Sequence, residues 1–323
     1  MASGFGRVQD FRIPNGYGRG EVCTKILKAM MTRAGKDKGM YSAVEHVARI
    51  CDLSDWENVS MAMLTAAFDC SGVGNQDKYF VMAGFVSPAK HWSEFDCEWR
   101  ARLQVDNLAY FHSNPFAHAT THPRKPFDSS WIGAEQRRRD LLADLLGIIQ
   151  LHAGRKLGCI LPKEVFLMLD NVTREQYAPM QIVLAARLIW GELMDWRRRE
   201  HKNSAVEMIF EDGDLGKGYL GKAIKEVSGQ WPIFRQKEDN AEKGFVAFTP
   251  LQAADLLAYE ILKATRDEGR PLNEVRIRFP YQALEKMPGD IRMLQSGGAG
   301  LIDAWTQVVK YFDDNPLPKP TVQ

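Results

Sequence analysis

The Ala66–Gly72 stretch constrains the fold most, because a short apolar run ends there in a single carboxylate and then a small-residue turn. Leu64–Phe68 is apolar, short and bounded by turn residues, which predicts a buried strand. The glycines after it allow the chain to reverse, and Tyr79–Val86 predicts the returning strand of a hairpin. Gly84 inside that strand indicates a bulge or close packing. Asp69 therefore ends a buried strand, where it needs a partner or a bound cation.

Composition places the chain among ordinary globular proteins. Its 42 lysine and arginine residues nearly cancel its 41 aspartate and glutamate residues, so net charge gives no support to a strongly nucleic-acid-binding surface. The five cysteines are scattered without C-x-x-C spacing, which argues against a disulfide framework or a zinc site. We see no signal peptide and no apolar run near the roughly 18 residues that span a bilayer. These features predict a cytoplasmic protein without a membrane partner.

The chain divides into a leader, a large domain and a tail. Residues 1–60 are expected to form an N-terminal extension that is partly helical or disordered, 61–312 the main domain, and 313–323 a flexible tail. Cys23–Arg33 and Tyr41–Cys51 have helical periodicity. Whether these two helices are a packing appendage, a partner-binding module or an extension that the fold does not need stays open.

Helices and strands are expected to alternate after the hairpin. The predicted helices are His91–Leu108, Glu135–Leu151, Glu175–Trp196, Lys217–Val227 and Pro250–Arg266. The predicted strands are Ala205–Phe210, a short one at Trp231–Phe234, and two apolar runs at Leu157–Leu161 and Val165–Leu169. Ala109–Trp131 is irregular, and a loop that long is usually functional or disordered. The alternation predicts an α/β (α+β) three-layer domain with a central mixed sheet and flanking helices.

Carboxylates occur in three positions where burial would be costly. Asp69 follows a strand, Glu211 follows another together with Asp212 and Asp214, and Asp255 lies inside an apolar helix rich in alanine. Each needs a lysine or arginine, or a magnesium or manganese ion held by oxygen ligands. Simpler roles stay open beside a metal site: a turn cap for the first, a solvated acidic turn for the second group, and a salt bridge for the helical aspartate.

Histidines gather in the irregular segment, at His112, His118 and His122. No cysteine accompanies them, and Pro123 interrupts a helical pair, so a loop is favoured over a zinc site. Only His112 keeps a functional interpretation.

Several motifs resemble those of a bacterial family called domain of unknown function 3800. Phe68–Gly72 resembles the family's opening Asp-Glu-Ser-Gly, with Cys70 in place of the glutamate. Leu251–Tyr259 is similar to its closing Gln-x-Ala-Asp-x-x-Ala signature. Tyr110–His112 resembles its middle histidine-containing segment, and Ile209–Gly213 fits its second acidic strand end. The likeness covers most of the chain, without the leader and the tail.

The resemblance implies a ribonuclease H-like fold, in which carboxylates on adjacent central strands and on a late helix hold one or two divalent ions. Carried over, Asp69, Glu211 and Asp255 are expected to bind Mg²⁺ or Mn²⁺. Asp212 is a further candidate ligand, because the sequence does not decide between it and Glu211. His112 is expected to act as an acid/base or to contact the substrate.

The function that the resemblance implies is hydrolysis of a phosphodiester with a divalent metal, by a nuclease acting on RNA or DNA. Two ions about 4 Å apart can activate a water and stabilise the leaving oxygen. One alternative is a non-catalytic ribonuclease H-like binding module in a defence or mobile-element system, which the cysteine at position 70 and the neutral net charge favour. Another is hydrolysis of a small nucleotide.

Overall fold

The computed structural model describes residues 63–74, 76–167, 180–200, 204–213, 216–239, 246–266 and 278–293. All of them belong to the unit Tyr41–Gln323. The predicted extension 1–60 with its two helices, Asp214 and the tail 313–323 lie outside the described residues. No helix in the described segments is long and apolar enough to cross a bilayer.

In the described part of the chain, six strands form one mixed sheet in the order β5-β4-β1-β2-β3-β6. Strands β1, β2 and β3 pair antiparallel in sequence order, whereas β4 is parallel to β1, β5 to β4 and β6 to β3. The strands are β1 Met63–Ser71, β2 Tyr79–Pro88, β3 Arg155–Pro162, β4 Ala205–Glu211, β5 Ile233–Arg235 and β6 Gly289–Met293. The predicted hairpin is β1 and β2, and the mixed sheet confirms the predicted α/β class.

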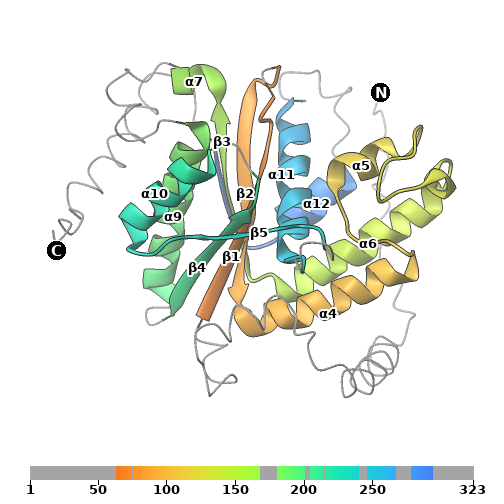
Figure 1. The fold of residues 1–323 in the computed structure, drawn as a ribbon, viewed down its shortest axis with the longest axis horizontal. Coiled ribbons are helices and arrows are strands. Elements are labelled where there is room, and N and C mark those ends of the chain that lie inside the picture. The colour runs from red at the N-terminus through yellow and green to blue at the C-terminus, as the bar shows by residue number, and fades with distance from the viewer. Residues whose placement is uncertain are drawn as a thin grey trace, which may run out of the picture. The chain divides into compact units, whose positions relative to one another are not determined.

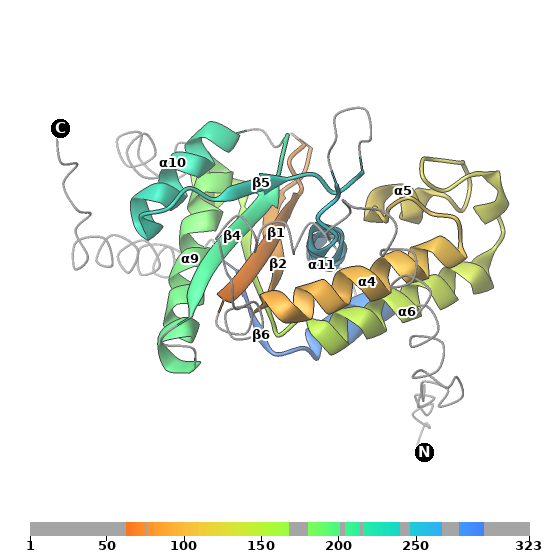
Figure 2. The ribbon, with the colours of Figure 1, turned by 60° about the horizontal axis from the view of Figure 1, so that its bottom comes forward.

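Helices cover both faces of this sheet, as Figures 1 and 2 show. Helices α7, α9 and α10 pack on one face, and α4, α5, α6, α11 and α12 lie on the other side. Their bounds are α4 Ala89–Val105, α5 Ser113–His118, α6 Glu135–His152, α7 Lys163–Leu167, α9 Gln181–Glu200, α10 Lys217–Ser228, α11 Pro250–Arg266 and α12 Phe279–Glu285. The described residues therefore form a large apolar core on each side of the sheet.

Alternation along β1 decides which side chains meet which helices. Leu64, Ala66 and Phe68 belong to the core under α9 and α10, whereas Ala67 belongs to the core under α11. Successive side chains of a strand point to opposite faces. Asp69 therefore lies on the α11 face, two residues beyond Ala67.

Two predicted regions differ from the structure. Val165–Leu169 was predicted as a strand, which is wrong, because Lys163–Leu167 forms the short helix α7 directly after β3 ends at Pro162. The irregular Ala109–Trp131 segment contains α5 and the 3-10 turn Ser129–Trp131. The segment joins the core, because its aromatic rings pack in edge-to-face or tilted contacts with one another and with Trp99; these rings are Phe111, Phe116, Phe127 and Trp131.

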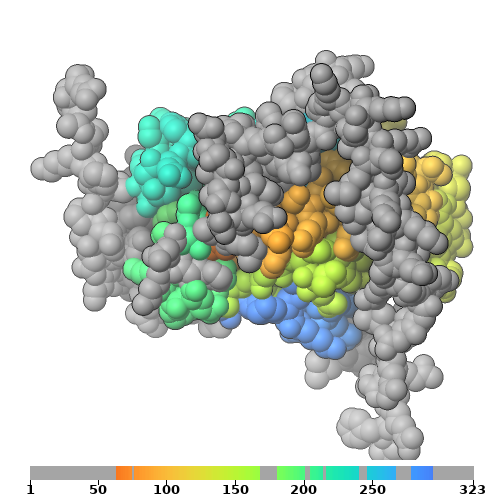
Figure 3. All heavy atoms as spheres, turned by 90° about the horizontal axis from the view of Figure 1, so that it is seen from below, coloured from red at the N-terminus to blue at the C-terminus, as the bar shows by residue number. Residues whose placement is uncertain are grey.

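The sequence analysis assigned no element to Gly289–Met293, which forms the edge strand β6. Helix α12 before it packs beside α6, and Figure 3 shows the two segments side by side. The Lys156 ammonium of β3 donates hydrogen bonds to the backbone oxygens of Glu285 and Met287, each at 2.6 Å. These hydrogen bonds help to attach residues 285–293 to the sheet, and contacts to backbone atoms leave no periodic apolar pattern in the sequence.

Gly84 meets the expectation of close packing. It pairs with Phe68 across the hairpin, and a Cβ atom built on it would lie 1.8 Å from the backbone oxygen of Ala67. Gly72 follows β1 with φ of +78°, and a Cβ there would lie 2.2 Å from the backbone oxygen of Tyr79. Both positions therefore require glycine, and the end of β1 that carries Asp69 is closely held against β2.

Candidate active site

Three parallel strands end at one edge of the sheet and carry charged residues there. Phe68 of β1 pairs with Phe210 of β4, so the next residues, Asp69 and Glu211, follow at the same edge. Glu211 pairs in turn with Arg235, the last residue of β5. Lys237 comes two residues later, beyond the end of β5.

Helix α11 supplies the fourth charged group. It packs against β1 and β2, and its alanines at 253, 254 and 258 are fully buried in that contact. Asp255 lies among them and is 5% exposed. The small side chains allow the helix axis to come close to the sheet, so the Asp255 carboxylate reaches the edge where β1 and β4 end.

The three carboxylates meet at the ammonium of Lys237. Its Nζ atom lies 3.1 Å from Oδ2 of Asp69, 2.9 Å from Oε2 of Glu211 and 3.5 Å from Oδ1 of Asp255. The side chains of Asp69, Asp255 and Lys237 are at most 8% exposed, whereas that of Glu211 is 25% exposed. We call these four residues the Lys237 cluster. It is enclosed by the fold and opens on the side of Glu211.

Lys237 and Asp255 hold each other in the ionised form. Burial alone would lower the pKa of Lys237, but the carboxylates of Asp69, Asp255 and Glu211 raise it well above its usual value. Burial alone would also raise the pKa of Asp255, yet Lys237, His112 and hydrogen bonds from Ser113 bring it below its usual value. The ammonium and this carboxylate are therefore both charged at neutral pH.

His112 and Ser113 contact the cluster from the start of α5. The backbone N–H of Ser113 donates to Oδ2 of Asp255 at 2.7 Å, and Nε2 of His112 lies 3.4 Å from Oδ1 of the same carboxylate. The His112 side chain is 34% exposed. It therefore stands at the rim of the cluster, with Nε2 toward Asp255 and about a third of its side chain exposed to solvent.

Gln252 joins the segments that surround the cluster. Its side-chain oxygen accepts hydrogen bonds from the Trp99 indole at 2.7 Å and from the Phe111 backbone at 2.8 Å. Its side-chain nitrogen donates to the backbone oxygen of Lys237 at 2.7 Å. Gln252 is 1% exposed. One buried amide thus fixes α11, α4, the segment before α5 and the backbone of Lys237 relative to one another.

Arg100 of α4 holds the chain on both sides of residues 240–245. Its guanidinium binds Asp96 at 3.0 Å, Asp239 at 3.1 Å and the backbone oxygen of Ala247 at 2.8 Å. The Ala247 N–H donates to Asp239 at 2.7 Å. These contacts fix the chain close to Lys237, in addition to the bond from Gln252.

Asp212 lies apart from the cluster. Its carboxylate forms an ion pair with Lys217 at the start of α10, and the side chains of Asp212 and Lys217 are 34% and 45% exposed. Alternation explains the difference, because Ile209 and Glu211 share the α11 face of β4. Of the two acids that the sequence left undecided, Glu211 is therefore the one directed to Asp69 and Asp255. His118 and His122 are exposed and do not join the cluster.

The donor set suits a hard divalent cation in its chemistry, because Mg²⁺ and Mn²⁺ prefer carboxylate oxygens. The position that the three carboxylates share is held by the Lys237 ammonium. Among the described residues, no group of three or more His, Cys, Asp or Glu side chains is arranged to hold a metal ion. The residues therefore fit a metal ion by type, on the condition that the ammonium moves away.

Sequence reasoning missed Lys237, Gln252 and Ser113 as parts of the site. A lysine two residues after a short strand has no distinctive pattern, and a sequence does not indicate which backbone N–H groups bind a carboxylate. One signal was available for Lys237: three carboxylates predicted to converge require a counter-cation. The salt bridge left open for Asp255 is present, and its partner is Lys237, 18 residues earlier.

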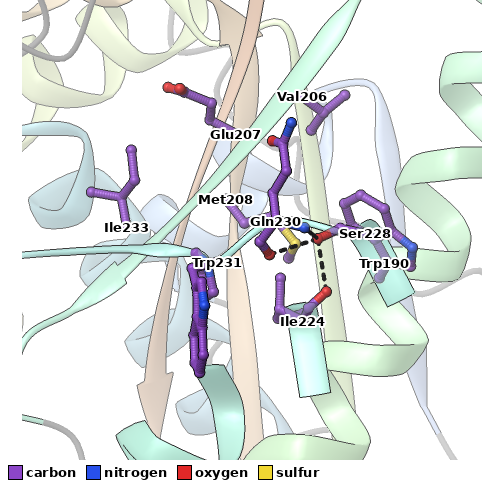
Figure 4. A pocket seen from close by; sticks show the side chains of 10 residues that line it. Trp190, Val206, Glu207, Met208, Ile224, Ser228, Gln230, Trp231 and Ile233 are labelled. Atoms are coloured by element: carbon purple, nitrogen blue, oxygen red, sulfur yellow. Dashed lines mark hydrogen bonds between the residues drawn. The ribbon is translucent and has the colours of Figure 1, made fainter. Parts of the chain in front are cut away.

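A separate small pocket lies near the start of β4, between β5, α9 and α10 (Figure 4). Trp190, Glu207 and Trp231 contribute to its lining, and Ser228 there donates to the backbone oxygen of Ile224 at 2.7 Å. It contains none of the predicted site residues. The candidate site is therefore the Lys237 cluster.

Comparisons with known proteins give no relative of this chain: no family model matches it, and neither curated proteins nor solved structures match. The assignment to a family and to a ribonuclease H-like fold stays a prediction.

Proposed function

We propose that this protein is a divalent-metal-dependent phosphodiester hydrolase with a ribonuclease H-like fold, acting as a nuclease. The supporting observation is the convergence of Asp69, Glu211 and Asp255 within 3.5 Å of one cation position. These acids come from adjacent central strands and a late helix, the placement that the family resemblance implies. Asp69 and Asp255 are 186 positions apart in the sequence, and the fold brings their carboxylates to the same ammonium.

The residues have distinct roles in this proposal. Asp69, Glu211 and Asp255 would hold Mg²⁺ or Mn²⁺, which when bound supplies an activated water and stabilises charge on the leaving oxygen. Ser113 and Gln252 orient the carboxylate of Asp255 and the backbone around it. His112 lies at the exposed rim, where it can contact a phosphate or exchange a proton with the substrate. Asp212 has no role in this mechanism, because Lys217 binds it outside the cluster.

A specific observation favours the alternative, a non-catalytic binding module. Lys237 already neutralises part of the acidic centre and occupies the position where an ion would bind. If the ammonium never leaves, the cluster is a structural ion-pair network that holds β1, β4 and α11 together.

Cleavage assays separate the two functions. Purified protein with Mn²⁺ is expected to cut at least one of single-stranded RNA, DNA and an RNA–DNA hybrid, and small nucleotides tested in parallel define the substrate class. Asp69→Asn should lower the rate by more than about 100-fold, because even indirect partners of metal ligands typically change activity 10- to 100-fold. Asp212→Asn is the matched control and should retain activity, since it makes the same change at the neighbouring strand end.

Circular dichroism must show that Asp69→Asn is folded. Equal behaviour of wild type, Asp69→Asn and Asp212→Asn on every substrate would contradict the hydrolase and support the binding module.

A further inference from the structure

The Lys237 cluster contains more negative charge than its lysine can balance. Three carboxylates lie around one ammonium, which leaves two negative charges when all four groups are ionised. His112 adds a basic group at the rim, with Nε2 at 3.4 Å from Oδ1 of Asp255. A divalent cation at the position of the ammonium would balance the charge of the three carboxylates more fully than one ammonium does.

The backbone of Lys237 is fixed, whereas its side chain has a direction in which to leave. Gln252 binds its backbone oxygen at 2.7 Å, and the neighbouring Gln236 accepts a hydrogen bond from Phe248 at 2.9 Å. The ammonium is carried by a flexible four-carbon stem. Asp69 is 2% exposed, but the side chains of Glu211 and His112 are 25% and 34% exposed. Solvent therefore reaches the cluster at Glu211 and His112, and a rotation of the stem toward them would carry the ammonium toward solvent while the backbone stays in place.

We propose that Lys237 is a built-in counter-cation that a divalent metal ion displaces, so that metal binding and release of the lysine are one exchange at one site. The proposal rests on the metal-binding function above and adds its regulation. Without metal, the ammonium holds the three carboxylates together and the fold does not depend on an ion. With metal, the same oxygens bind the ion and Lys237 turns outward. The lysine therefore sets the metal concentration at which the site fills.

The size of the effect follows from competition. A minor conformer that lies a few kcal/mol above the major one is populated at about 0.1–10%. The apparent affinity of a ligand is reduced by the fraction of protein in the competent state. If the state with Lys237 turned outward has such a population, replacing the lysine tightens Mn²⁺ binding about 10- to 1000-fold.

The test is a Mn²⁺ titration, by calorimetry and by electron paramagnetic resonance of free Mn²⁺, on wild type, Lys237→Met and Lys217→Met. Lys217 is the matched control, because its ion pair with Asp212 lies at the same sheet edge and its removal changes net charge equally. The expected result is binding at least about tenfold tighter in Lys237→Met than in both other proteins.

Equal affinities in the three proteins, or weaker binding in Lys237→Met, would overturn the exchange while leaving the metal site in place. Absence of Mn²⁺ binding in wild type and Lys237→Met would overturn the exchange together with the proposed function.

A second measurement uses the unaltered protein and covers the case in which Lys237→Met does not fold. Acetylation of lysines by an N-hydroxysuccinimide ester, quantified by mass spectrometry, reports access to each Nζ atom. Mn²⁺ should increase acetylation of Lys237 at least about fivefold, as expected when a buried minor state becomes the major one, and leave that of Lys217 unchanged. Bound Mn²⁺ with Lys237 still protected would refute the exchange.

Discussion

Replacement of Gln252 by methionine tests whether one amide holds the site together. Methionine has a similar length and is compatible with a helix, so the change removes polar atoms with little loss of volume. It leaves three partners without their hydrogen bonds: the Trp99 indole N–H, the Phe111 N–H and the Lys237 backbone oxygen. Trp99 and Phe111 are fully buried and Lys237 is 7% exposed, so water cannot easily replace the amide.

The expected loss of stability is large for a single side chain. A buried polar group left unsatisfied costs about 1–3 kcal/mol, so three such groups cost about 3 kcal/mol at the lower end of that range. For a domain of this size, that loss corresponds to a decrease in melting temperature of roughly 6–12 °C. It is also a substantial part of the roughly 5–15 kcal/mol that keeps a typical protein folded.

Urea unfolding followed by circular dichroism measures this loss, with Gln150→Met as the control. Gln150 lies exposed on α6 and donates a single hydrogen bond to the backbone oxygen of Ala283. Its replacement should cost less than about 0.5 kcal/mol, as for most surface substitutions. Equal midpoints and equal slopes for the two variants would show that the Gln252 amide does not stabilise the fold, and the argument from its three partners would fail.

Two further outcomes follow from the geometry. Burial tends to raise the pKa of Asp255, but Lys237, His112 and Ser113 lower it overall. A carboxyl whose pKa is lowered by folding stabilises the fold at any pH above its unfolded pKa of 3.8. This stabilisation is lost as the pH falls through the pKa of the folded state. The free energy of unfolding of wild type should therefore exceed that of Asp255→Asn at pH 7 and approach it below pH 3.8; a constant difference between pH 7 and 3 would contradict the lowered pKa. Gly84→Ala should cost about 1–3 kcal/mol or more by overpacking against Ala67, whereas Gly147→Ala in α6, where nothing lies within 4 Å, should stabilise by up to about 1 kcal/mol. Similar thermal unfolding of the two alanine variants would argue against the close approach in the hairpin.

The sequence predicted the parts of the fold that rest on local patterns. The apolar run before Asp69 and the returning run after the glycine turn became β1 and β2. The predicted helix from Pro250 to about Arg266 is α11 with the same bounds. Short-range periodicity and turn chemistry are sufficient for such elements. They were insufficient for α7, because the apolar run Val165–Leu169, which overlaps it, is too short to show a period that distinguishes strand from helix.

The candidate site could be predicted only in part, because its acids carry a local signal and their partners do not. Carboxylates at strand ends and in an apolar helix can be recognised from the sequence as groups that are costly to bury. Lys237 becomes significant only when β5 is placed beside β4, which is information about the sheet order. Arg138 illustrates the same limit: it belongs to a run of three arginines near the start of α6, yet it is 8% exposed and lies over the Phe116 ring, which its local sequence does not indicate.

The two-residue alternation of β4 makes the protein unequally tolerant of different genetic changes. Conservative replacements within the strand leave every side chain on its own face. Gain of one codon ahead of Phe210 would carry that phenylalanine to the position of Glu211 in the charged centre, whereas loss of one codon would carry Glu211 to the position of Phe210 in the apolar core. Among descendants of this chain, the length of β4 should therefore change far less readily than its composition.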